Sequence, residues 1–141
     1  MRALGLDLGT KTLGVAITDR TNTLVSPLKT IIYSNTDELI KEVKRIVLEY
    51  GITDLVLGLP KNMDGSLGFA ADRSMKFYEE LKNNFDLNIH LIDERLSTVE
   101  AERILIDNAD MSRGKRKKVI DSVAAMIILE NYIKKEKNKN E

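Results

Sequence analysis

The chain has 141 residues, of which 43% are hydrophobic and 31% charged, values that fit one folded domain and exclude a disordered chain or a two-domain enzyme. The absence of cysteine and the presence of a single histidine exclude disulfide bonds, thiolate metal sites and histidine-rich zinc sites. Lys and Arg (22) balance Asp and Glu (22) over the whole chain, but residues 111–141 are basic, with nine cationic side chains against four acidic ones.

The first third of the chain is predicted to form three consecutive antiparallel strands. Apolar runs occupy residues 3–8 and 13–18, and the turn-like segment 9–12 between them predicts a hairpin. A second turn leads into a third strand over residues 23–33. Pro27 within this strand favours an edge position or a β-bulge, because proline cannot donate a hydrogen bond to a neighbouring strand.

Helices then alternate with strands. Apolar residues at helical spacing predict a helix that begins with a capping box at Asn35 and Glu38 and ends at Gly51. Strands are predicted at 54–59 and 88–93, and further helices at 69–84, about 97–108 and 115–135. The strand at 54–59 is apolar throughout its centre, which is typical of a central strand covered on both faces.

This order of elements predicts an α/β fold with helices on both faces of a mixed sheet. We expect one domain over residues 1–135 and a polar, lysine-rich tail over residues 136–141 that is frayed. The helix at 69–84 is expected to bury the face formed by Ala71, Met75, Tyr78 and Leu81. His90 alternates with apolar neighbours, and we expect a core or edge histidine.

Carboxylates at three places differ from ordinary surface acids. Asp7 interrupts an apolar strand, where a carboxylate is costly unless it is paired, hydrogen-bonded or bound to a metal. Asp93 and Glu94 close the strand at 88–93, and strand ends of this kind bind ligands in many α/β sheets. Asp121 shares a helix face with small and apolar residues that would pack closely on the sheet.

Each of these acids also has a purely structural interpretation. Asp7 could accept hydrogen bonds from the following turn, the Asp93–Glu94 pair could bind Arg95, and an acid at position 121 could favour a helix start. If they converge, however, clustered acids repel one another unless a cation neutralises them. Oxygen-only ligands suit Mg²⁺ or Mn²⁺, and two such ions about 4 Å apart would promote phosphodiester hydrolysis.

Four sequence motifs stand in order along the chain, at residues 4–16, 58–66, 93–98 and 121–125. Together they resemble the YqgF-type family of the ribonuclease H-like superfamily, whose members are described as Holliday junction resolvases or pre-16S ribosomal RNA nucleases. The resemblance covers the chain up to its tail. It implies a ribonuclease H-like domain with a five-stranded sheet of three antiparallel strands followed by two parallel ones, in agreement with the order predicted above.

The same resemblance implies that Asp7, one acid of the Asp93–Glu94 pair and Asp121 form a metal-binding catalytic site. Family descriptions favour Glu94 within the pair, with Asp93 as the alternative. Spacing alone cannot choose, because neighbouring residues of a strand point to opposite faces of the sheet. We expect the site to hold Mg²⁺ or Mn²⁺, as two ions.

Several polar residues outside the acids are predicted to bind the substrate. Thr10 and Lys11 lie in the first turn, and a loop after the strand at 54–59 could grip phosphates, although it could also be a plain surface loop. The basic run from Lys115 to Lys118 suits phosphate contacts, with a solvated helix start as the alternative. The predicted substrate-binding residues are Thr10, Lys11, Lys61, Asn62, Arg95, Lys115, Arg116, Lys117 and Lys118.

The function expected from these features is metal-dependent hydrolysis of a structured nucleic acid, either pre-ribosomal RNA or branched DNA. Resolving a Holliday junction requires a dimer with two active sites, and nothing in the sequence marks a dimer interface. We therefore favour processing of the 5′ end of pre-16S ribosomal RNA by a monomer or weak homodimer. A catalytically silent nucleic-acid-binding or ribosome-assembly module is the competing hypothesis. We expect a cytoplasmic location, since there is neither a signal peptide nor an apolar run of about 20 residues.

Overall fold

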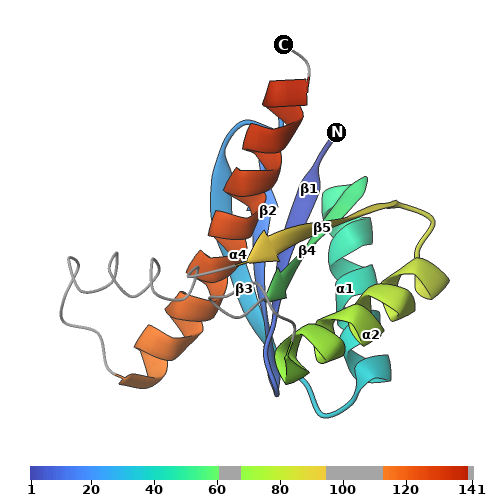
Figure 1. Ribbon diagram of the computed structural model, residues 1–141, viewed down its shortest axis with the longest axis vertical. Helices are drawn as coiled ribbons and strands as arrows, with labels where there is room; N and C mark the ends of the chain where they lie inside the picture. Colours follow the sequence, from blue (N-terminus) through green and yellow to red (C-terminus); the bar gives the residue numbers. More distant parts are fainter. Residues whose placement is uncertain (61–67, 95–112, 140–141) are drawn as a thin grey trace.

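The computed structural model describes residues 1–60, 68–94 and 113–139, and it arranges five strands in one mixed sheet (Figure 1). The strands are β1 (Ala3–Leu8), β2 (Thr12–Thr18), β3 (Val25–Ile32), β4 (Asp54–Pro60) and β5 (Asn88–Glu94). Their order across the sheet is β3-β2-β1-β4-β5, with β2 antiparallel to both β1 and β3, and with β4 parallel to both β1 and β5. The predicted α/β class and the predicted strand arrangement are confirmed.

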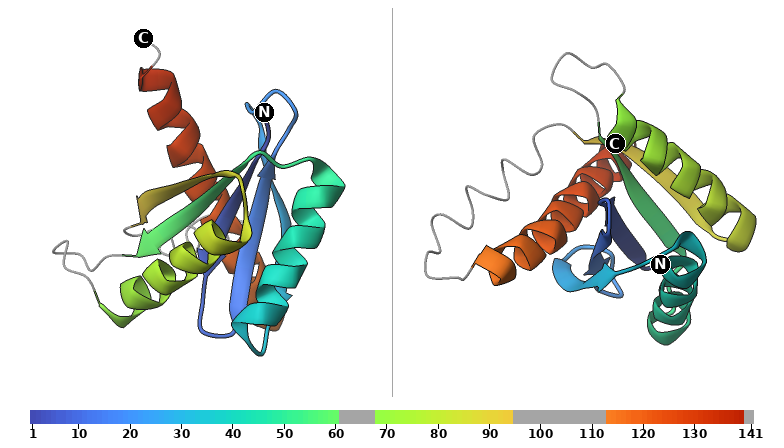
Figure 2. Two further views of the ribbon diagram at one scale, coloured as in Figure 1. Left: turned by 90° about the vertical axis from the view of Figure 1, so that its right-hand side faces the viewer. Right: turned by 90° about the horizontal axis from the view of Figure 1, so that it is seen from below.

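Helices cover both faces of this sheet. Figure 2 shows α4 (Arg113–Lys139) on one face, and α1 (Thr36–Tyr50) and α2 (Phe69–Asn84) on the other. The helix predicted at about 97–108 lies outside the described residues. The helix predicted at 115–135 begins earlier and ends later than expected, so that the predicted polar tail is helical through Lys139. None of the described helices is long and apolar enough to cross a bilayer.

The ends of α1 follow from its local sequence. The Asn35 side chain accepts a hydrogen bond from the Glu38 backbone N–H at 2.9 Å, as the capping box predicts. The Glu38 carboxylate accepts from the backbone N–H of Ser34, at 3.3 Å, and not from that of Asn35. Gly51 ends the helix at φ 65°, in the left-handed region that glycine adopts without strain.

Both predictions for Pro27 are correct. Its strand, β3, lies at the edge of the sheet, where a missing N–H donor is tolerated. The register with β2 also shifts beside it: Val15 pairs with Lys29 whereas Ala16 pairs with Pro27, so that Leu28 is the extra residue of a β-bulge.

Two apolar layers hold the helices to the sheet. In the layer under α1 and α2, Leu55 and Leu57 of β4 are fully buried, while Val56 is fully buried on the α4 side. The prediction of a central strand covered on both faces is therefore confirmed. The layer under α4 combines alanines, among them the fully buried Ala125, with larger residues of α4 such as Ile128 and Leu129.

The buried face of α2 differs from the predicted one. Ala71 and Leu81 are buried as expected, but Ser74 and Phe77 complete the face, in place of Met75 and Tyr78. Residues 77 and 78 are neighbours on the helix, and both are aromatic. Phenylalanine takes the buried place because it has no hydroxyl group that needs a partner, while tyrosine can keep its hydroxyl group in water.

Candidate active site

Asp7 lies near the carboxyl end of β1, where it pairs with Gly14 of β2. Alternate residues of β1 face opposite helices: Leu4 and Leu6 belong to the layer under α1 and α2, whereas Ala3 belongs to the layer under α4. The two-residue period of a strand therefore places Asp7 on the α4 face. Its side chain is half-buried there.

The predicted acid pair lies at the same end of the sheet. Because β1, β4 and β5 are parallel, their carboxyl ends lie together, and Asp93 and Glu94 are the last two residues of β5. Ile92 is buried against α4, whereas Leu91 packs on the opposite layer and Asp93 is exposed. The strand period assigns position 94 to the face that carries Asp7, and position 93 to the other face.

The early part of α4 also reaches this end of the sheet. The hydroxyl groups of Ser122 and Thr30 lie 3.1 Å apart. Thr30 is level with Asp7, because both residues pair with Gly14. Position 121 directly precedes Ser122, so α4 brings the third predicted acid to the end and the face of the sheet where Asp7 lies.

The close approach of α4 to β1 depends on Gly5. A Cβ atom at this position would lie 2.6 Å from the Ala125 backbone oxygen and 2.6 Å from Leu129 Cγ. Only glycine leaves room for a helix at this distance. Gly5 stands two residues before Asp7, and Ala125 stands one helical turn after position 121, so this contact governs how closely that part of α4 approaches β1.

Asp7, Glu94 and Asp121 thus belong to elements that meet at one end and on one face of the sheet. The side chains of Glu94 and Asp121 lie outside the described part of the structure, and only their places in β5 and α4 are described. Among the described residues, no three His, Cys, Asp or Glu side chains lie close enough together to bind a metal ion. The set of three ligands stays a prediction.

The turn that carries Thr10 and Lys11 lies beside Asp7 and is firmly held. The Gly9 N–H donates to the Thr12 carbonyl oxygen at 2.7 Å. Tyr33 binds the turn twice, since its backbone N–H donates to the Lys11 carbonyl oxygen at 3.0 Å and its hydroxyl donates to the Gly9 carbonyl oxygen at 2.7 Å. The Thr10 and Lys11 side chains are exposed, so they are accessible to a substrate.

The other predicted substrate-binding residues are less fully described. Lys61, Asn62 and Arg95 lie outside the described residues. The run of Lys115, Arg116, Lys117 and Lys118 lies in the first turns of α4, before Ser122, and its side chains are not described. These substrate contacts therefore stay predictions.

A second polar cluster lies at the opposite end of the sheet, where Asp54 pairs with Ala3. Asp54 is 2% exposed and accepts hydrogen bonds from the Tyr132 hydroxyl at 3.0 Å and from the Asn88 amide at 3.2 Å. His90 Nε2 lies 3.3 Å from that hydroxyl and 3.5 Å from the Asp54 carboxylate. Burial, together with the neighbouring Asp54 carboxylate, raises the pKa of Tyr132 well above its ordinary value.

The prediction for His90 is correct, because this residue lies half-buried on the edge strand β5. The sequence analysis missed the roles of Asp54 and Tyr132. Asp54 begins a strand and Tyr132 belongs to a helix 78 residues later, and no local pattern connects them. It also missed the two bonds from Tyr33 to the first turn.

Comparison with known proteins adds an independent line of evidence. A family model named RuvX and described as "Holliday junction resolvase" matches residues 1–135. The chain is 50% identical over 139 residues to a protein of Thermoanaerobacter pseudethanolicus, covering 99% of this chain and 100% of that one. It is 48% identical over 138 residues to a protein of Caldanaerobacter subterraneus subsp. tengcongensis, covering 98% and 99%. Both relatives carry the name "Putative pre-16S rRNA nuclease".

A solved structure resembles the fold at much lower identity. The chain matches Thermus thermophilus RuvC in complex with a Holliday junction substrate with a TM-score of 0.60 and 10% identity, over 96% of both chains. At this identity the likeness concerns the fold alone. It confirms the ribonuclease H-like architecture that the sequence motifs imply.

Proposed function

The chain belongs to the RuvX family, and on that premise we propose that it is a nuclease that hydrolyses phosphodiester bonds in pre-16S ribosomal RNA with divalent metal ions held by Asp7, Glu94 and Asp121. One observation supports the site above all others. Three elements that are far apart in the chain, β1, β5 and α4, bring these positions to one end and one face of the sheet.

The donor chemistry of these residues fits Mg²⁺ or Mn²⁺. All three are carboxylates, which are hard oxygen ligands, and the chain has no cysteine to offer a soft metal. The one histidine, His90, contacts Tyr132 and Asp54 instead. Two such ions, when bound, would activate a water molecule and stabilise the oxygen that leaves the phosphate.

The protein's own residues would hold and orient the substrate around these acids. Lys11 is exposed on a turn fixed by Tyr33, so its ammonium group is well placed for the phosphate beside the cut. The basic run at 115–118 precedes the acid at 121 in α4 and would bind the phosphates of the adjoining strand. We favour Glu94 over Asp93 because position 94 shares the face of Asp7.

The choice of RNA follows the relatives that match nearly the whole chain, both of which are named for pre-16S rRNA. Trimming an RNA end needs one active site, so a monomer suffices, and a pre-ribosomal substrate places the protein in the cytoplasm. The description of the family model names a Holliday junction, which needs two symmetric cuts and hence two active sites. Junction cleavage is therefore one outcome of the test below.

Cleavage assays with Mn²⁺ on pre-16S rRNA and on a four-way DNA junction test this proposal. Asp7→Asn, Glu94→Gln and Asp121→Asn should each reduce RNA cleavage by at least about 100-fold, since each removes a ligand of the metal ions whose positive charge would stabilise the transition state. Asp86→Asn is the matched control, because Asp86 is exposed and precedes β5 at the opposite end of the sheet. Cleavage of the junction but not of the RNA would overturn the proposed substrate.

Metal binding can be measured without cleavage. Mn²⁺ should raise the melting temperature of the wild type and of Asp86→Asn, because a ligand that binds the folded state stabilises it. It should have little effect on Asp7→Asn. If Asp7→Asn is stabilised as much as the wild type, the ions bind elsewhere and the proposed site is wrong.

A further inference from the structure

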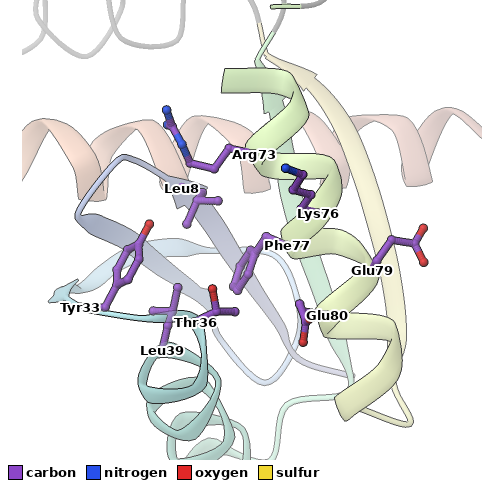
Figure 3. Close-up of a pocket in the computed structure, with 9 residues that line it drawn as sticks. All are labelled: Leu8, Tyr33, Thr36, Leu39, Arg73, Lys76, Phe77, Glu79 and Glu80. Atoms are coloured by element: carbon purple, nitrogen blue, oxygen red, sulfur yellow. The ribbon is translucent and has the colours of Figure 1, made fainter. Parts of the chain in front are cut away.

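A cavity of about 460 Å³ opens between α1 and α2, at the same end of the sheet as Asp7 (Figure 3). Leu8 lies at its base, with Tyr33 on one wall and with Arg73, Lys76 and Phe77 of α2 on the other. Leu8 directly follows Asp7 in β1, and consecutive residues of a strand face opposite sides. The cavity and the candidate active site therefore lie at the same end of the sheet, on its opposite faces.

The apolar part of this cavity is rigid and partly aromatic. Phe77 is 4% exposed and packed in the core, so it closes the cavity floor but offers little of its ring to a ligand. Tyr33 is held by its hydroxyl bond to Gly9 and by its backbone bond to Lys11. Burial raises the pKa of Tyr33, although the nearby Arg73 charge opposes this shift, so the hydroxyl stays protonated and keeps its bond to Gly9 at neutral pH. The half-buried ring of Tyr33 suits the flat face of a nucleic-acid base.

The cationic part of the cavity is formed by Arg73 and Lys76 of α2. Among the described residues, neither Arg73 nor Lys76 forms an ion pair within 4.0 Å, in contrast to Arg45, which binds Glu42 at 2.8 Å. Figure 3 shows Arg73 projecting from α2 toward the end of β1, with the Lys76 amine beside α2 on the same side of the cavity. The two cations are therefore available to an anion that arrives from the side of Asp7.

The acids of this cavity lie farther along α2. Glu79 and Glu80 also line it: Glu80 follows Arg73 by seven residues, roughly 10 Å along a helix, but follows Lys76 by four residues, about one turn. In Figure 3, Glu79 projects away from the two cations. Arg73 is thus the cation farther from these acids, at the end next to the candidate active site, where a phosphate would lie.

We propose that this cavity binds one unpaired nucleotide of the substrate strand, beside the phosphate that is cut, with its base against Tyr33 and its phosphate against Arg73 and Lys76. The volume lies in the range of pockets that hold a small organic ligand, and one nucleotide fits it. The inference rests on the proposed function and deepens it, since it requires the RNA to be single-stranded next to the cut. Paired nucleotides would be excluded.

Binding of a short fluorescent oligo(U) without divalent metal, followed by anisotropy, tests the cavity. Arg73→Gln and Lys76→Gln should each weaken binding by about tenfold, because each removes a charge-assisted contact to phosphate. Lys82→Gln is the matched control: Lys82 is an exposed cation of α2 that lies 5.2 Å from the Tyr78 ring and does not line the cavity. It should bind as the wild type does.

Three further measurements define the ligand. A fully paired RNA duplex should bind Arg73→Gln and the wild type equally, whereas equal weakening of both ligands would mean a general electrostatic patch and would overturn the proposal. Uridine monophosphate should bind far more weakly than the oligonucleotide, and equal affinity would indicate a site for free nucleotides instead. Photocross-linking of 5-iodouridine in the strand should label Tyr33, and labelling elsewhere would contradict the proposed contact.

The outcomes separate this inference from the proposed function. If the wild type cuts RNA but both variants bind oligo(U) normally, the cavity does not bind the strand and the nuclease proposal stands. If no tested nucleic acid is cut but oligo(U) binding still depends on Arg73 and Lys76, the nuclease proposal is wrong and the binding site stands. Circular dichroism of each variant confirms that it is folded.

Discussion

Replacing Gly5 with alanine tests whether the close approach of α4 to β1 holds the candidate active site together. The added Cβ would lie 2.6 Å from the Ala125 backbone oxygen, and ordinary contacts begin near 3.4 Å. The Leu129 side chain, also 2.6 Å away, can change its rotamer, but the carbonyl oxygen belongs to the helix backbone. The helix itself must therefore move.

The distances give the size of the effect. To restore an ordinary contact, α4 must retreat by roughly 0.8 Å at Ala125, and overpacking of this kind costs about 1–3 kcal/mol. For a chain of this length the melting temperature should fall by roughly 3–10 °C. Position 121 lies one turn from Ala125, and because a displacement near 1 Å can cost about 100-fold in rate, we expect cleavage to fall by about 10- to 100-fold.

Urea unfolding and RNA cleavage, both measured well below the melting temperature, check these two effects. Gly51→Ala is the matched control. An alanine there meets nothing within 4 Å, but it must adopt φ 65°, which costs about 1 kcal/mol. Gly51 ends α1 shortly before the start of β4, at the end of the sheet away from Asp7, so this variant should lose stability and keep its cleavage rate.

Two results would contradict the reasoning. If Gly5→Ala unfolds at the same urea concentration as the wild type, the helix does not approach the strand as closely as the structure shows. If it is destabilised but cleaves at the wild-type rate, the position of α4 does not control the active site. The second result would remove Asp121 from the proposed ligands.

Three further predictions concern the two ends of the sheet. Tyr132→Phe removes the hydroxyl group bound to buried Asp54 and should lower the free energy of unfolding by about 1.5–3 kcal/mol in urea at neutral pH; an unchanged midpoint would mean that water replaces the bond. Because the pKa of Tyr132 is raised in the folded state, its contribution to the free energy of unfolding is complete below about pH 10 and is lost as the pH rises further. The free energy of unfolding should therefore depend less on pH in Tyr132→Phe than in the wild type above about pH 10. An equal pH dependence in the two proteins would argue against this role of Tyr132. Replacing the four cations at 115–118 with glutamine should reduce the log–log salt slope of RNA binding by about 0.7 to 0.9 for each lost phosphate contact, and an unchanged slope would place the phosphate contacts elsewhere, with Lys11 next to test.

Much of the fold was predictable because its signals are local. The cap at Asn35, the left-handed glycine at the end of α1 and the edge strand with its bulge at Pro27 each depend on residues within a few positions of one another. The chemistry of single residues decides them: an amide oxygen accepts a nearby N–H, glycine lacks a Cβ, and proline lacks a donor. The small residues near Asp121 likewise predicted close packing on the sheet, and Ala125 is fully buried.

Other features depend on how the helices pack on the sheet, and no local pattern contains them. The sequence predicts two aromatic residues side by side in α2, but packing buries Phe77 and leaves Tyr78 half-buried. The bond from Tyr132 to Asp54 joins residues 78 positions apart. The cavity under Arg73 exists only because α1 and α2 lie over the end of β1.

The acid pair at the end of β5 shows which part of a prediction comes from the sequence and which part needs the tertiary structure. By itself, the sequence determined that positions 93 and 94 fall on opposite faces, because side chains alternate along any strand. Which of these faces also carries Asp7 depends on the register of three parallel strands and on which face α4 covers. Only the tertiary structure decided this, since the energy that selects one face comes from burying Ala3, Ile92 and Ala125 together, and these residues meet only after the chain has folded.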